Sequence, residues 1–363
     1  MIRITNSMMS RSFLYSLNNN MNHMNALSTQ MYTGKRINNI ADDPVGVVKS
    51  LQIRGKLNAV GQFTKNVRET RNWLYQTETG LDKINVAIKD VYVATLDACS
   101  GTKNQSDKEA IAALVKELRD HIVDLGNSTY GDKYIFGGYN TNKAPFVLES
   151  TGVEQPRNDT DWSVLWAAAG NTASDWLDGT VTDADKKIFK DAWRADPANQ
   201  TDVLKYNGID LSDRVAIVAA GEDQQDIQFA VGFGMVQSCS FNGPTLLGSG
   251  ADNVYKTLND LYNVLMDSSS TNDDIREFVT KTQDAQSYIL ALTSQVGGRT
   301  NRLDMIESRY DDDTLNYLEM QSNIEDADEA EVIMNFKMAE AVYRAALEAG
   351  AKIIQPSLMD YLR

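Results

Sequence analysis

The sequence is poor in cysteine, proline and long apolar runs. Its 363 residues include two cysteines and six prolines, and the separation of Cys99 from Cys239 gives no Cys-x-x-Cys motif. A disulfide is therefore permitted but not implied. No run of about 18 apolar residues occurs, which argues against a membrane-spanning helix. The first 20 residues lack an apolar core of about 7 to 15 residues, so we expect no cleaved secretory signal.

The sequence also lacks the motifs of an active site or a metal site. His23 and His121 are its two histidines, and neither has the spacing of a metal-binding pair. The Thr-Gly-Lys at residues 33–35 fails as a phosphate loop, because Arg36 stands where Ser or Thr is required and a helical pattern precedes it. We therefore predict no enzymatic activity, no cofactor and no bound metal.

The net charge of −15 argues against nucleic acid as the main partner, because phosphates require basic surfaces. The charge is unevenly distributed. Residues 1–100 hold 12 basic against 7 acidic side chains, whereas residues 251–363 hold 10 against 21. Two interpretations stay open. Either these are solvated helix faces, as we expect for the acidic runs 311–313 and 325–331, or the basic beginning of the chain lies along its acidic end.

Two long segments, one near each end of the chain, repeat apolar residues every seven positions. A sustained seven-residue repeat is typical of helices that pair in a coiled coil. Because the row of apolar side chains along each segment must be covered, we predict that the two segments pair with each other within the chain. The residues assigned to this intrachain coiled coil are Val60, Val67, Leu74, Leu81, Ile88, Ile289, Val296, Leu303, Ile306, Tyr310, Tyr317 and Ile324.

The segment before residue 33 predicts a helix with one apolar stripe, at three- and four-residue steps. Its polar face is rich in asparagine, a poor helix former, so this helix should be marginal until something covers the stripe. Six of the 13 methionines lie in the first 31 residues, and methionine suits surfaces that adapt to several neighbours. Incidental helix core is the alternative. The residues predicted to contact other subunits are Leu14, Leu17, Met21, Met24 and Met31, with Met334 and Met338 near the other end.

A third helix is predicted over about residues 106–127. It opens with Ser106 and Glu109 at the spacing of a capping box, in which each side chain bonds the backbone of the other. An apolar residue recurs every three or four positions after this start, so the helix should pack one face against the two long segments.

The stretch 140–248 has a different composition. Four of the five tryptophans fall within a short span of it, as expected of a separate small core, and Ile227, Phe229 and Val231 alternate in the manner of a strand. Packing in a core is the stronger expectation for the aromatic side chains, and a carbohydrate site is the alternative.

The predicted fold class is mainly α: a long antiparallel helical rod, or coiled coil, built from both termini, with an inserted mixed α/β or β-rich domain. We assign residues 1–43 and 322–363 to terminal helices, residues 44–139 and 249–321 to the rod, and residues 140–248 to the insert.

Three sequence segments resemble a known family. TGKRINNIADDPVGV (residues 33–47) is similar to the amino-terminal motif of bacterial flagellins and the hook-associated proteins related to them. SQVGGRTNRLDMIESR (294–309) and SNIEDADEAEVIMNFK (322–337) resemble the other terminal signature of that family. The resemblance covers roughly residues 1–145 and 250–363, and the pairing of motifs at both ends makes it specific.

Three further segments resemble the hook-associated branch of the family rather than flagellin itself. They are MIRITNSMM (residues 1–9), DKYIFGGYNTNKAPF (132–146) and PSLMDYL (356–362). The insert between them is not diagnostic.

The resemblance implies a structural protein of the extracellular bacterial flagellum, exported without a cleaved signal by the flagellar type III apparatus. It implies self-association in a ring-like layer beyond hook-associated protein 1 and beneath the first flagellins, with a chaperone for export. The terminal helices would line a central channel and the insert would face outward. Alternatives are a short flagellin that forms filament, or a carbohydrate-binding module in the insert.

Within this family, residues 33–46 become the hinge between the inner and outer layers. Lys35, Arg36, Asp42 and Asp43 are then candidates for ion pairs between subunits, although exposed pairs contribute only about 0–1 kcal/mol. Either aspartate can also cap the helix that follows.

Overall fold

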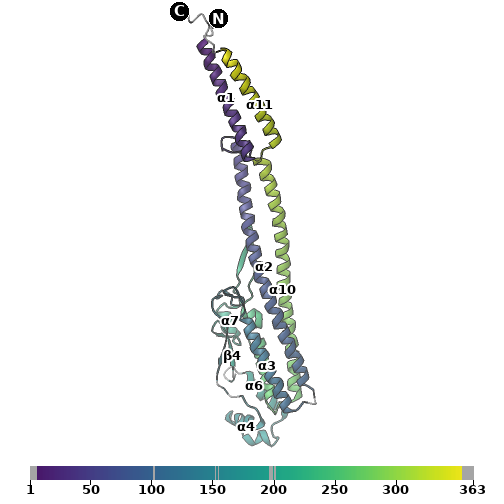
Figure 1. Ribbon diagram of the computed structural model, residues 1–363. Helices are drawn as coiled ribbons and strands as arrows, with labels where there is room; N and C mark the ends of the chain where they lie inside the picture. Colours follow the sequence, from purple (N-terminus) through teal and green to yellow (C-terminus); the bar gives the residue numbers. More distant parts are fainter. Residues whose placement is uncertain are drawn as a thin grey trace, which may run out of the picture. The chain divides into compact units, whose positions relative to one another are not determined.

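The computed structural model describes residues 6–100, 103–151, 153, 155–195, 199 and 202–353 (Figure 1). The chain divides into two compact units. The first combines Met1–Gln62 with Ser308–Arg363, and the second comprises Phe63–Glu307. This division differs from the three parts assigned from the sequence, whose boundaries stay a prediction. Two of the segments that carry the family resemblance, residues 1–5 and 356–362, lie outside the described residues.

Five long helices make up most of both ends of the chain. They are α1 (Asn6–Thr33), α2 (Pro44–Ala98), α3 (Gln105–Gly126), α10 (Asn272–Glu325) and α11 (Glu329–Ile353). The predicted fold class, mainly α with long helices from both ends and small sheets between them, is confirmed.

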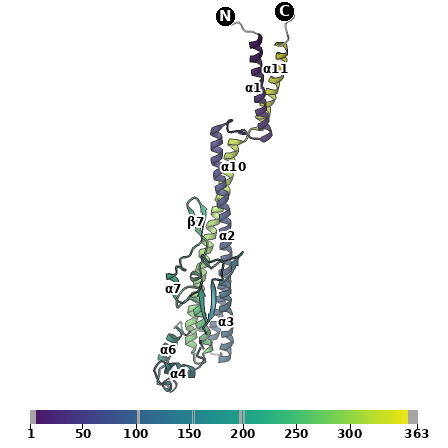
Figure 2. The same ribbon diagram turned by 90° about the vertical axis from the view of Figure 1, so that its left-hand side faces the viewer.

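Helices from opposite ends of the chain run antiparallel in the first unit. Helices α1 and α11 lie side by side in both views (Figures 1 and 2). The first part of α2 accompanies the last part of α10, where Arg54 NH2 lies 2.8 Å from Glu325 Oε2 and the Lys56 ammonium lies 5.6 Å from the centre of the Tyr317 ring. Val60 and Tyr310 are buried here, and Tyr317 and Ile324 are partly exposed.

In the second unit α9 (Val254–Met266) packs along α3, and apolar side chains of α2, α3, α9 and α10 are buried. Each such side chain contributes roughly 1.5–3 kcal/mol when fully buried. The buried members are Val67, Leu74, Leu81 and Ile88 of α2, Val115 and Ile122 of α3, Leu258, Leu261 and Leu265 of α9, and Ile289, Val296, Leu303 and Ile306 of α10.

A buried arginine joins three elements of this unit. The guanidinium of Arg119, 1% exposed, donates to Asn259 Oδ1 on α9 and lies 3.5 Å from Asp202 Oδ2. The central carbon of the guanidinium, Cζ, is also 5.1 Å from the centre of the Tyr255 ring. Because a buried cation is stable only with several partners, this cluster fixes how α3 meets α9 and the strand that begins at Asp202.

The predicted capping box of α3 is wrong by two residues. Asn104, in an extended conformation, caps the helix: its side chain accepts from Asp107 N at 2.9 Å, and Asn104 N donates to the Asp107 carboxylate at 3.1 Å. Asparagine and aspartate fulfil the same two roles as the serine and glutamate of the usual motif. The pair Ser106 and Glu109 therefore lies inside the helix.

We expect Asn104→Ala to lower the free energy of unfolding of the second unit by about 1 kcal/mol, because the Asp107 amide in the first turn of α3 loses its cap. All five tryptophans lie within this unit, so tryptophan fluorescence during urea denaturation reports on it. Asn72→Ala, at an exposed position of α2, is the matched control, and an equal loss in both variants would contradict the capping role.

The described part of residues 129–247 contains three small antiparallel sheets. The first is the hairpin of β1 (Thr129–Tyr130) and β2 (Lys133–Tyr134). The second has the order β3 (Phe146–Ser150), β4 (Asp202–Tyr206) and β5 (Ile209–Asp210). The third pairs β6 (Gln228–Gly232), the strand expected from alternation, with β7 (Met235–Ser238). Two short helices, α7 (Arg214–Ala219) and α8 (Gly243–Leu247), complete this region.

The tryptophans form the core of a small helical cluster. Helices α4 (Asp159–Ala168), α5 (Ala173–Leu177) and α6 (Asp183–Ala195) surround Trp162 and Trp176. Both rings are fully buried, and their centres are 6.5 Å apart. The indole N–H of Trp162 donates to Asp267 Oδ2 at 2.8 Å, just beyond the end of α9. The aromatic residues thus pack in a core, which was the stronger of the two expectations.

No helix within the described residues has an apolar stretch that could cross a bilayer. The same residues contain no group of three His, Cys, Asp or Glu side chains that could hold a metal ion. Cys99 and Cys239 are free thiols, and burial raises the pKa of Cys239 to about 12.

Candidate subunit interface and hinge

Helices α1 and α11 bury very little apolar surface against each other. Across the described positions of these helices, Leu27 and Val332 are the buried large apolar side chains, each 7% exposed. Gly350 permits one further close approach, since a Cβ there would meet the Phe13 ring at 2.3 Å. Helical pairs in proteins are held chiefly by packing of an apolar face, so this pair lacks most of the core that would stabilise it.

The large apolar side chains of these two helices are instead mostly exposed. Met21 is 46% exposed and Met334 is 59% exposed, whereas Leu17 and Met24 are partly exposed. Exposed apolar side chains in this number favour a surface for docking another protein, and their contact with other subunits stays a prediction. The exposed members are Met8, Met9, Leu14, Tyr15, Met21, Met31 and Tyr32 of α1, and Ile333, Met334, Met338, Val342 and Leu347 of α11.

An isolated antiparallel β-bridge between Lys35 and Asp326 connects the predicted hinge segment to the residues before α11. Gly34 ends α1 with φ of +66°, a conformation that glycine adopts without strain. Arg36 N then donates to the Glu325 carbonyl at 2.6 Å, and Ala327 N donates to the Gly34 carbonyl at 2.9 Å. These bonds join the segment after α1 to the segment before α11.

Glu325 is the polar centre of the hinge. It is 4% exposed, and Arg54 binds it with two bonds, from Nε to Oε1 at 2.9 Å and from NH2 to Oε2 at 2.8 Å. Ser50 Oγ donates to Oε1, and Gln321 donates to Oε2 at 3.1 Å. A bidentate arginine contact is among the strongest and most directional in proteins, so Glu325 locks the start of α2 to the end of α10.

These bonds favour the ionised carboxylate. The Arg54 guanidinium, with Ser50 and Gln321, lowers the pKa of Glu325 to about 2, from an ordinary value of 4.5. The neighbouring Asp326 also has a lowered pKa, chiefly because the Lys35 ammonium donates to it. The hinge is therefore an ion-pair network that is fully charged at neutral pH.

The four charged residues predicted to contact other subunits have partners within the chain. Lys35 pairs with Asp326 at 2.5 Å, and Arg36 donates to the Ile324 carbonyl at 2.9 Å and lies 3.5 Å from Asp43. Asp43 also caps α2 through Gly46 N at 2.9 Å. A role for these side chains between subunits stays a prediction.

Asp42 has a local role as well. Its carboxylate accepts from the backbone of Asn38 at 3.0 Å and of Asn39 at 2.7 Å, and so closes the turn between α1 and α2. Of the two aspartates considered as caps, Asp43 is the one that caps the helix.

The sequence did not reveal Glu325. The prediction that the acidic run 325–331 is a solvated face is wrong for Glu325, which is buried. Ser50 and Arg54, four residues apart on one face of α2, both donate to Glu325. Arg68 and Arg71 likewise pair with Glu307 in the second unit. The structure thus supports the interpretation in which the basic beginning of the chain lies along its acidic end.

Substitution of Gly34 by alanine tests the hinge backbone. At φ of +66° an L side chain is strained, so we expect Gly34→Ala to cost about 1 kcal/mol. Gly55→Ala is the matched control, because Gly55 lies in α2 with open space around it, and the change should there gain up to about 1 kcal/mol. Thermal unfolding followed by circular dichroism would show opposite shifts. Shifts of the same sign would contradict the hinge geometry.

Comparison with known proteins shows which family the chain resembles. Residues 4–141 match the bacterial flagellin N-terminal helical region. Over these residues the chain is similar to flagellins. This confirms the resemblance to the flagellin family that the amino-terminal motif predicted.

Relatives of the chain include both hook-associated proteins and flagellins, such as the flagellin of Clostridium tyrobutyricum, which is 25% identical over 35% of this chain and 33% of that protein. Flagellar hook-associated protein 3 of Salmonella typhimurium is 29% identical over 152 residues, which are 42% of this chain and 48% of that protein. The chain therefore spans about half the length of the curated relatives it matches. Within the family, the resemblance to hook-associated protein 3 is confirmed. These relatives are components of the flagellum.

Two solved structures share the fold. A flagellar hook-associated protein from Vibrio parahaemolyticus has a TM-score of 0.54 at 16% identity, covering 78% of this chain and 100% of that one. The flagellar junction protein FlgL from Legionella pneumophila has a TM-score of 0.51 at 12% identity, with coverage of 78% and 100%. At such identities the likeness concerns the fold alone.

Proposed function

We propose that this chain is a structural adaptor at the hook–filament junction of the bacterial flagellum. It polymerises through α1 and α11 in a ring-like layer between hook-associated protein 1 and flagellin. It is exported without a cleaved signal by the flagellar type III apparatus, with a chaperone that keeps the terminal helices apart before assembly. The observation that carries this proposal is the exposed apolar surface of α1 and α11, beside which Leu27 and Val332 are the only large apolar side chains that are buried in the described part of the pair.

Assembly would complete the core that a single chain lacks. Met21, Met24 and Leu14 would be covered by terminal helices of adjoining copies, and each buried side chain would contribute roughly 1.5–3 kcal/mol. Ordering of the pair would then be coupled to binding, which lowers the net gain but makes it conditional on the correct neighbour. Methionine suits this role because the two neighbours, above and below the layer, differ.

The predicted parts receive roles in the same scheme. Residues 1–43 and 322–363 line the central channel, with residues 33–46 as the hinge. Residues 44–139 and 249–321 form the wall around it, and residues 140–248 face outward. The Glu325 network holds the hinge at a fixed geometry, so that the channel-lining pair meets its neighbours in register.

Deletion of the protein from the bacterium that encodes it tests the proposal. Electron micrographs should then show hooks without filaments, with flagellin released into the medium. Normal filaments in the deletion strain would refute the proposal.

A short flagellin is the second candidate, because the matched region is named for flagellin. The two functions differ in self-assembly. The adaptor should bind purified hook-associated protein 1 and flagellin without forming long polymers alone, whereas a flagellin should form filaments in isolation. Electron microscopy of the purified chain, with and without these partners, distinguishes them.

A further inference from the structure

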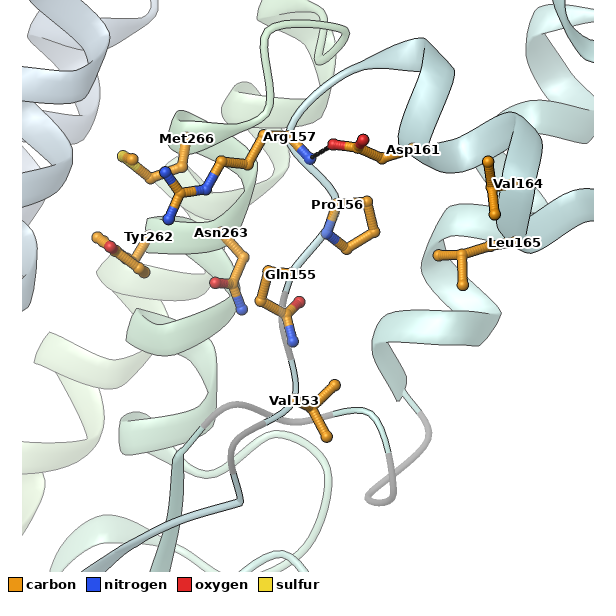
Figure 3. Close-up of a pocket in the computed structure, with 10 residues that line it drawn as sticks. All are labelled: Val153, Gln155, Pro156, Arg157, Asp161, Val164, Leu165, Tyr262, Asn263 and Met266. Atoms are coloured by element: carbon orange, nitrogen blue, oxygen red, sulfur yellow. Dashed lines mark hydrogen bonds between the residues drawn. The ribbon is translucent and has the colours of Figure 1, made fainter.

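A cavity of about 750 Å³ opens in the second unit, lined by α4, α9 and the segment before α4 (Figure 3). The Arg157 N–H donates to Asp161 Oδ2 at 2.9 Å in its wall. Both of these residues are exposed and their side chains have opposite charges, so the lining selects no class of ligand and we assign none. The first unit, in contrast, carries unpaired charges of one sign on each of two helices.

These helices are the parts of α2 and α10 that belong to the first unit. Residues 44–62 of α2 hold three basic and no acidic side chains, whereas residues 308–325 of α10 hold five acidic side chains and one basic. Some of these charges pair within the chain, since Arg54 binds Glu325 and Arg309 lies 3.9 Å from Asp313. Among the described residues, no ion pair involves the others, which are Lys49, Lys56, Asp311, Asp312 and Glu319.

The exposed side of α2 combines its two unpaired lysines with apolar side chains. Val45, Val48 and Leu51 follow one another at three-residue steps and are 65%, 54% and 60% exposed. Lys49 and Lys56 are also exposed, and their separation of seven residues places them on one side of the helix. The second of these lysines lies over an uncharged tyrosine ring, which leaves its charge without a counterion. We call these five residues the basic face.

The exposed side of α10 has a similar pattern with the opposite charge. Leu315 and Leu318 are 67% and 49% exposed, and Asp311 precedes the first of them by one turn. Asp312 and Glu319, both exposed, are seven residues apart, which is the same separation as that of the two lysines. Each pair therefore spans about 10 Å along its helix. We call these five residues the acidic face.

We propose that the basic face of one copy of the chain docks against the acidic face of the next copy. This inference rests on the proposed function, and it adds a second contact between copies to that of α1 and α11. The apolar side chains of the two faces would cover each other, and the equal spacing would let both lysines meet a carboxylate at once. Exposed ion pairs contribute little each, so the charges chiefly set the register and exclude wrong neighbours.

The two faces require a head-to-tail arrangement of copies. Either face placed against another copy of itself would oppose like charges, which disfavours a two-fold dimer. A contact between two different surfaces passes from copy to copy, and it closes into a ring or continues as a helix. Both faces belong to the unit that contains α1 and α11, so the surface proposed for assembly extends onto α2 and α10.

Charge reversal tests this contact. Lys49→Glu/Lys56→Glu reverses the basic face, and Asp312→Lys/Glu319→Lys reverses the acidic face. Sedimentation velocity of the purified 363-residue chain at low ionic strength should show association that increases with concentration. Each double variant should associate more weakly by about tenfold or more. An equimolar mixture of the two variants should associate as the native chain does, because each variant then meets the opposite charge on the other.

A matched control changes the same charges elsewhere. Lys83→Glu/Lys89→Glu reverses two exposed lysines of α2 in the second unit, and it should associate like the native chain. All the exchanged side chains are exposed, so circular dichroism should show every variant folded. The proposal would be overturned by a native chain that stays monomeric at every concentration, by double variants that associate normally, or by a mixture without rescue. Binding of flagellin through these faces, without binding between copies, would also overturn it.

This experiment separates the inference from the proposed function. Rescue in the mixture concerns contact between copies alone. If rescue fails while the deletion strain shows hooks without filaments, the adaptor function stands and this contact is wrong. Normal filaments in the deletion strain would refute the adaptor function, whatever sedimentation shows.

Discussion

The double variant Met21→Asp/Met24→Asp is expected to abolish assembly while the monomer remains folded. Both side chains lie on the apolar stripe of α1, and Met21 is 46% exposed in the single chain. In water the two carboxylates cost little. In an interface each must give up its hydration without a partner, which costs several kcal/mol. Association with hook-associated protein 1 and flagellin should therefore weaken by more than about 100-fold, and cells that carry the variant should have hooks without filaments.

The matched control places the same charges elsewhere. Met305→Asp/Val86→Asp changes two exposed apolar residues of the second unit, 68% and 56% exposed respectively. This variant has the same net charge as the test variant and should assemble normally. Circular dichroism and tryptophan fluorescence should show both proteins folded. If both variants assemble, or if both fail, the stripe on α1 does not carry the interface.

Glu325→Gln is expected to weaken the contact between the segment after α1 and the segment before α11. The amide can keep one bond to Arg54, but it loses the charge that makes the pair bidentate and strong. Arg54 is itself half-exposed, so solvent takes up part of the loss, and we expect a local cost of about 2 kcal/mol. Hydrogen exchange of the Arg36 and Ala327 amides, which form the backbone crossing, should accelerate by about 10- to 100-fold at pH 7.

The effect of this variant should depend on pH with a definite sign. The folded pKa of Glu325, about 2, lies below its ordinary value of 4.5. The stabilisation is therefore fully present above pH 4.5 and is lost as the pH falls toward 2. After correction for intrinsic exchange, the native chain and Glu325→Gln should differ most near neutral pH and converge in acid. Glu319→Gln, at an exposed position of α10, should match the native chain throughout. A constant difference at every pH would contradict the ion-pair role.

The helices at the two ends of the chain could be predicted because their signals are local. A seven-residue apolar period indicates a pairing helix whatever its partner, so segments around Leu74 and Val296 already specify long helices. The strand over Gln228–Gly232 was visible for the same reason, in alternating apolar residues. The exact start of α3 could not be predicted in this way. The pair of Asn104 and Asp107 and the pair of Ser106 and Glu109 have nearly equivalent patterns two residues apart.

Features that depend on distant parts of the chain could not be predicted from local patterns. Glu325 looks like its acidic neighbours in sequence, and its burial depends on Ser50 and Arg54, about 270 residues earlier. This site arises from tertiary pairing, which no window of the sequence contains.

Hydrogen exchange of α1 and α11, measured in the lone chain and again after assembly with hook-associated protein 1 and flagellin, tests the central claim most directly. The account predicts that amides of both helices exchange within seconds in the lone chain and become strongly protected in the assembly, while amides near Leu74 and Leu261 stay protected in both. The account would be contradicted if the amides of α1 and α11 were already strongly protected from exchange in the lone chain and assembly did not change their protection.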